Sequence, residues 1–107
     1  MKLAELNARL MKLNPDNSMH QVETVADADG VLFLCPKCYR ENNGPAGTHS
    51  IMCWFSKVPV DRPVGNGRWN PVGHDINDLT FVGPGAFSIL LLSGCGWHGF
   101  IKDGCAE

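Results

Sequence analysis

Two short motifs in the chain combine residue types that bind transition metals. Cys35 and Cys38 belong to CPKC, and Cys95 and His98 belong to CGWH. Structural zinc takes four thiolate or imidazole ligands in a tetrahedron, and a tight turn of this kind directs two ligands to one side of the backbone. Proline stiffens the first turn, while glycines let the backbone around the second fold closely about an ion. We therefore predict one structural zinc ion bound by Cys35, Cys38, Cys95 and His98.

A second set of ligands competes with this one. Cys35, Cys38, His49 and Cys53 have the spacing C-x2-C-x10-H-x3-C, which is close to that of zinc fingers. The segment HSIMCWF is typical of a β-strand, on which His49 and Cys53 would lie about 13 Å apart, too far for one ion. On a helix these two residues would lie one turn apart and could both bind the ion. Independently of this second set, His49 could approach the ion of the first set as a further or outer ligand. Otherwise Cys53 is expected to be a buried apolar residue, and Cys105 a free thiol.

Length and composition indicate one small globular domain over residues 1–107. Nine Lys and Arg against eleven Asp and Glu give a formal net charge of −2, so no basic surface for nucleic acid or anionic membrane is indicated. No apolar run approaches the roughly 20 residues of a transmembrane helix, and the charged N-terminal segment does not read as a signal peptide. Five cysteines in such a chain indicate free thiols in a reducing compartment, so we expect a cytoplasmic protein.

One helix and several short strands would position the metal-binding motifs. Leucines at spacings of three, four and three residues predict an amphipathic helix over residues 2–13, within an N-terminal segment 1–14 that Asn14-Pro15 ends. Strand-like segments follow, at residues 21–26, 31–34, 49–55, 79–82, 87–92 and 100–101. The predicted fold class is α+β, mostly β: an N-terminal amphipathic helix followed by five or six short antiparallel strands.

Turns and loops join these predicted strands. Asp-Gly pairs favour reversals at residues 27–30 and at Asp103-Gly104, and Gly83-Pro84-Gly85 would close a hairpin between the strands on either side of it. The polar segment 40–47 is expected to be a loop. Residues 56–78 contain three prolines and three glycines and predict a long irregular loop.

The two metal-binding motifs lie far apart in the sequence. Cys38 and Cys95 are 57 positions apart, whereas a zinc finger or ribbon closes a loop of about 12–20 residues. The ion would therefore tie an early part of the chain to a late one, and would stabilise a domain with a limited core. Removal of the ion should therefore unfold the domain.

Four segments of the chain carry a resemblance to a known family: FLCPKCYRENNGPAGTHSIMCWF, GRWNPVG, DLTFVGPGAFSILL and GCGWHGFI. They resemble small phage, prophage and bacterial proteins of unknown function, in which an early CP-type cysteine knuckle pairs with a late C-x-x-H-F-like knuckle. The resemblance covers about residues 30–104 and departs from the family pattern at Gly99, which separates the histidine from Phe100. It implies zinc on the two knuckles and a phage or prophage origin, with the host-cell cytoplasm as location, and it brings no established reaction.

The function predicted from these features is that of a non-enzymatic, zinc-stabilised module that binds a host or phage protein. Trp54, Trp69 and Trp97 are candidates either for contact anchors or for core packing. Two alternatives stay open. One is a small zinc metalloenzyme of hydrolase type with an open ligand position, although no H-E-x-x-H pattern supports it. The other is a zinc-knuckle nucleic-acid binder, which the negative net charge opposes.

Overall fold

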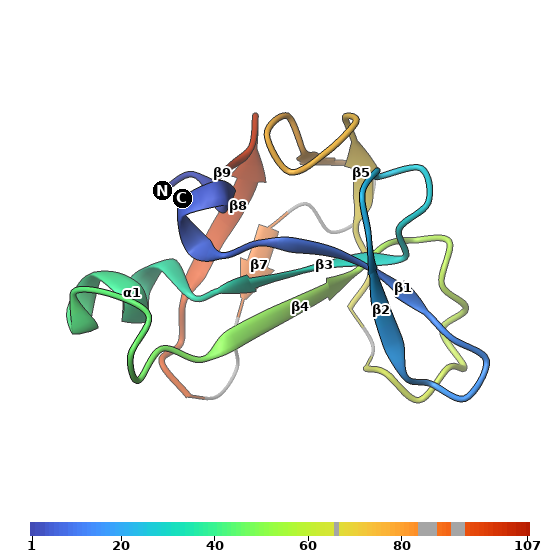
Figure 1. The fold of residues 1–107 in the computed structure, drawn as a ribbon, viewed down its shortest axis with the longest axis horizontal. Helices are drawn as coiled ribbons and strands as arrows, with labels where there is room; N and C mark the ends of the chain where they lie inside the picture. Colours follow the sequence, from blue (N-terminus) through green and yellow to red (C-terminus); the bar gives the residue numbers. More distant parts are fainter. Residues whose placement is uncertain (66, 84–87, 91–93) are drawn as a thin grey trace.

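The central sheet has four antiparallel strands in the computed structural model, which describes residues 1–65, 67–83, 88–90 and 94–107 (Figure 1). In spatial order they are β2 (Met19–Val22), β1 (Arg9–Leu13), β3 (Gly30–Leu34) and β4 (Ser50–Trp54). In the β3–β4 pair, Val31 lies opposite Cys53 and Phe33 opposite Ile51, and all four are buried. Alternate residues of a strand face the same side of its sheet, so one face of this pair forms part of the core.

Two smaller antiparallel sheets complete the fold. One consists of β5 (Asn70–Val72) and β6 (Thr80–Val82), the other of β7 (Ser88–Leu90), β8 (His98–Lys102) and β9 (Cys105–Ala106). The turn between β8 and β9 is formed by Asp103 and Gly104, with φ angles of 49° and 76°. Two central residues with positive φ suit the right-handed twist of a hairpin, and this confirms the turn predicted from the Asp-Gly pair.

Aromatic side chains join the three sheets in one core. The rings of Phe33 on β3 and Trp97, just before β8, make an edge-to-face contact with centroids 6.2 Å apart. Phe81 on β6 makes a similar contact with Phe55 and stacks on Trp69. The Trp69 indole also donates a hydrogen bond of 2.8 Å to the carbonyl oxygen of Ser88. The mostly β, antiparallel character predicted from the sequence is thereby confirmed.

The N-terminal segment differs from the amphipathic helix predicted over residues 2–13. It contains a short 3-10 helix, η1 (Leu3–Leu6), and then β1, which pairs with a strand on each side. Leu10 packs in the main core, while Leu13 lies on the opposite face of β1 beside Trp54 and Val58. Two leucines at helical spacing therefore pack on opposite faces of one strand. Pairing with two neighbouring strands, which sequence periodicity does not reveal, outweighs the local preference for helix.

The chain after Cys35 also differs from the expectation. It forms α1 (Pro36–Asn42), a seven-residue helix that begins with proline at its first position and ends at Asn43 with a φ of 55°. Proline suits this position because its fixed φ matches the helix and its missing N–H is not needed there. The segment that was predicted to be a loop from residue 40 is therefore helical through Asn42. Within the described ranges, no helix is long and apolar enough to cross a membrane.

The predicted hairpin of residues 79–92 takes different partners where the structure describes it. β6 pairs with β5, which lies inside the segment 56–78 predicted to be irregular, and β7 pairs with β8. The predicted turn at 83–85 and the strand at 87–92 extend beyond the described residues, which leave out 84–87 and 91–93. Strand partners depend on long-range packing, which the local pattern of turns and apolar residues does not specify.

Candidate metal centre

The four residues of the candidate metal centre come from three separate parts of the chain. Cys35 lies between β3 and α1, Cys38 lies in the first turn of α1, His49 precedes β4, and Cys95 precedes β8. β3 and β4 are antiparallel, so the end of one lies beside the start of the other. The main-chain N–H of Cys35 accordingly donates a hydrogen bond of 3.0 Å to the carbonyl oxygen of His49.

Packing of the β7–β8–β9 sheet brings Cys95 to the same place. Trp97, two residues later, is buried against Phe33 of β3. The Lys37 ammonium on α1 donates a hydrogen bond of 2.7 Å to the carbonyl oxygen of Cys95. An aromatic contact and a charged hydrogen bond thus hold the late segment against the early one.

The donor atoms of Cys35, Cys38, His49 and Cys95 all lie within 4.8 Å of one another. The Cys95 sulfur is 3.5 Å from the Cys35 sulfur and 3.4 Å from Nε2 of His49. Zn–S bonds of about 2.3 Å and Zn–N bonds of about 2.0 Å in a tetrahedron place neighbouring sulfurs about 3.8 Å apart, and sulfur and nitrogen about 3.5 Å apart. The arrangement therefore fits one tetrahedral ion with a Cys3His ligand set.

The charges of this cluster also favour a cation. The hydrogen bond with His49 lowers the pKa of Cys95 to about 6. The pKa of Cys38 is raised to about 12, mainly by burial and to a smaller extent by the hydrogen bonds and charges of the neighbouring cysteines. Burial also raises the pKa of Cys35. Three thiolates this close repel one another, and a divalent cation among them offsets that repulsion. Metal binding would therefore release the remaining thiol protons.

His98 lies outside this cluster, in contrast to its predicted role as the fourth ligand. Trp97 points into the core and is 6% exposed. His98 follows it in β8 and, since successive residues of a strand face opposite sides, is exposed on the other face, where its ring lies 6.1 Å from that of Phe100. His98 is the first residue of β8 and does not join Cys95 in the cluster.

His49 supplies the fourth donor of the cluster. It belonged to the competing ligand set and was also expected as a further or outer ligand of the ion. Cys53, the other member of that set, is fully buried on β4 opposite Val31, and burial raises the pKa of its thiol. Cys105 is half-buried in β9 and likewise lies outside the cluster. The structure therefore combines three cysteines of the first set with the histidine of the second.

The three tryptophans are packed within the protein. Trp54 and Trp97 are buried, and Trp69 is half-buried against Phe81. The core-packing interpretation fits them, and the contact-anchor interpretation does not.

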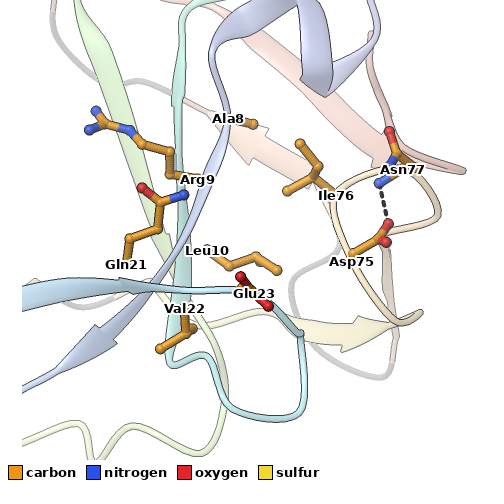
Figure 2. Close-up of a pocket in the computed structure, with 9 residues that line it drawn as sticks. All are labelled: Ala8, Arg9, Leu10, Gln21, Val22, Glu23, Asp75, Ile76 and Asn77. Atoms are coloured by element: carbon orange, nitrogen blue, oxygen red, sulfur yellow. Dashed lines mark hydrogen bonds between the residues drawn. The ribbon is translucent and has the colours of Figure 1, made fainter.

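A surface pocket of about 240 Å³ lies away from the metal centre, between β1, the end of β2 and residues 75–77 (Figure 2). Leu10, Val22 and Ile76 provide apolar side chains, and the Asp75 carboxylate accepts a hydrogen bond of 2.8 Å from the main-chain N–H of Asn77. None of the described residues that line it belongs to the Cys/His cluster, so the two features are separate.

The candidate metal centre is the strongest functional feature of the described chain. It joins β3, α1, β4 and the segment before β8 at one point, and its ligand set has the chemistry that zinc prefers. This assignment rests on geometry, because comparison with models of protein families, with curated proteins and with solved structures gave no match.

Proposed function

We propose that the protein is a zinc-stabilised binding module, in which one zinc ion bound by Cys35, Cys38, His49 and Cys95 holds the folded state. The observation that carries this proposal is the approach of four donor atoms to within 4.8 Å of one another from three parts of the chain. Sulfur-rich tetrahedral sites select zinc over the harder divalent cations, which prefer oxygen.

The role of the ion in this proposal is structural. Four protein ligands complete a tetrahedron and leave no position for a water molecule, which a catalytic zinc requires. Cys35 and Cys95 are 60 positions apart, so the ion would close a long loop of the chain. In α1 only Pro36 is buried, while Cys38 and Tyr39 are partly buried against the core, so the apolar contacts of this helix are few. Zinc binding would therefore supply folding free energy directly.

The binding role in this proposal belongs to the outer face of β8. His98, Phe100 and Lys102 alternate on this face and are exposed, and Phe100 is 45% exposed despite its large apolar ring. Exposed aromatic side chains are enriched at protein interfaces, whereas a net charge of −2 gives no support to nucleic-acid binding. A host or phage protein as the partner follows from the family resemblance of the CPKC and CGWHGF segments.

Metal analysis of the purified protein tests this proposal. We expect one zinc ion per chain, and we expect a strong chelator to remove both the ion and the cooperative thermal transition. A metal-free preparation that unfolds cooperatively at the same temperature as the zinc-loaded protein would contradict the structural role of the ion.

A further inference from the structure

We propose that Cys35 and Cys95 are a peroxide-sensitive pair, which forms a disulfide and releases the metal while the same two parts of the chain stay joined. This inference rests on the proposed zinc site and concerns its regulation. The two sulfurs are 3.5 Å apart, although the residues are 60 positions apart in the sequence. A covalent bond between them would therefore make the same long-range connection as the ion.

The chain around Cys95 has room for the required movement. A disulfide places the sulfurs about 2.05 Å apart, so the pair must close by about 1.5 Å. Gly94 and Gly96 flank Cys95, both with a φ of 69°, and a Cβ placed on either would meet no atom within 4 Å. Cys35, in contrast, is fully buried at the start of α1. We therefore expect Cys95 to move toward Cys35.

Exposure sets the order of the two chemical steps. Cys95 is half-buried beside the exposed ring of His49, whereas Cys35 is fully buried, so peroxide reaches the Cys95 sulfur first. The Cys95 thiolate attacks hydrogen peroxide, the O–O bond breaks, and a sulfenic acid and a hydroxide ion form. The Cys35 thiolate then attacks the Cys95 sulfur, the S–S bond forms, and a second hydroxide ion leaves. The two thiolates supply two electrons, and protonation of the hydroxides gives two water molecules.

The competing pair, Cys35 and Cys38, would have a different consequence for the fold. These residues are three positions apart in one turn of the chain, so a disulfide between them would close a very short loop. Constraint of the unfolded chain increases with loop length, so only the Cys35–Cys95 bond would replace the stabilisation that the ion provides. After oxidation Cys38 and His49 alone remain as ligands, which is too few to retain zinc.

The test is titration of the zinc-loaded full chain with hydrogen peroxide. We expect a chromogenic zinc indicator to report one ion released per two thiols lost. Peptide mapping should link Cys35 to Cys95, and the thermal transition should remain cooperative. A Cys35–Cys38 linkage, over-oxidised Cys95 without a disulfide, or loss of the thermal transition would overturn the inference. A chain that holds no zinc before peroxide is added would contradict the proposed function, and peptide mapping would still test the pairing.

Two ligand variants provide a matched comparison. Cys38→Ser and Cys95→Ser each lose one ligand, but only Cys38→Ser keeps the proposed disulfide pair. Oxidation should therefore restore cooperative unfolding to Cys38→Ser and leave Cys95→Ser unchanged. Recovery in both variants, or in neither, would contradict the inference. Cys105→Ser should oxidise like the wild type, which would show that Cys105 takes no part.

Discussion

The main-chain N–H of Cys35 donates a hydrogen bond to the carbonyl oxygen of His49, at 3.0 Å, where β3 ends and β4 is about to begin. This single contact explains why a histidine from the middle of the chain completes the cluster. Leu34 pairs with Ser50, so the residues just beyond this pair are held side by side. The strand register therefore determines which histidine lies in the Cys/His cluster.

His49→Ala should weaken zinc binding, whereas His98→Ala should not. Loss of an outer partner costs about 10- to 100-fold in metal affinity, so loss of a direct ligand should cost at least about 100-fold, or about 2.8 kcal/mol. Competition with a chelator of known zinc affinity measures this difference. Equal affinities for wild type and His49→Ala, with weaker binding by His98→Ala, would restore the ligand set predicted from the two motifs.

The cysteines should divide into ligands and non-ligands. Cys38→Ser should yield protein without zinc and without a cooperative thermal transition under reducing conditions, because the ion supplies folding free energy. Cys53→Ala and Cys105→Ala should each keep one zinc per chain, since both residues lie outside the cluster. Metal content and thermal unfolding of the same samples provide the measurement. A zinc-free Cys53→Ala protein would contradict the assignment.

The exposed face of β8 should be required for partner binding. Phe100→Ala should reduce affinity by about 30-fold, in line with the roughly 2 kcal/mol of an aromatic hot spot, while zinc content and the thermal transition remain. Val60→Ala is the matched control, because Val60 is 74% exposed but lies outside β8. Affinity capture from host lysate, followed by titration of the captured protein, gives the comparison. Equal binding by Phe100→Ala and the wild type would exclude this face.

The turn that contains His74 and Asp78 should contribute a pH-dependent term to stability. Asp78 accepts main-chain hydrogen bonds from Asp75 (3.0 Å) and His74 (2.8 Å), and its second oxygen lies 3.0 Å from Nδ1 of His74. The bond from the Asp75 main chain is the largest cause that lowers the pKa of Asp78 to about 2, and the bond with Asp78 raises the pKa of His74.

The two shifts define a window of pH for this contribution. The Asp78 part is present above the ordinary pKa of 3.8 and is lost as pH falls toward about 2. The His74 part is present below the ordinary pKa of 6.5 and is lost as pH rises through the raised value. The difference in thermal midpoint between wild type and Asp78→Asn should therefore be largest between about pH 4 and 6.5. A difference that stays constant from pH 2 to 9 would contradict the ion pair.

Local sequence patterns were sufficient to predict part of the Cys/His cluster. Cys35 and Cys38 are close together in any compact turn, so their proximity can be predicted without knowledge of the fold. The mostly β character follows from short apolar segments rich in β-branched and aromatic residues and separated by turn formers. The Asp103-Gly104 turn is equally local, since it depends on two residues that tolerate a positive φ.

The strand at the N-terminus and the histidine of the cluster depend on contacts between distant residues, so only the tertiary structure determines them. β1 replaces the predicted helix because it pairs with strands on both sides, and the leucines on its two faces enter two separate apolar clusters. His49 replaces His98 for two reasons. The β3–β4 register places His49 beside Cys35, and burial of Trp97 turns His98 to the opposite face of β8. A motif can identify candidate ligand types, but strand register and side-chain alternation select which histidine joins the cysteine cluster.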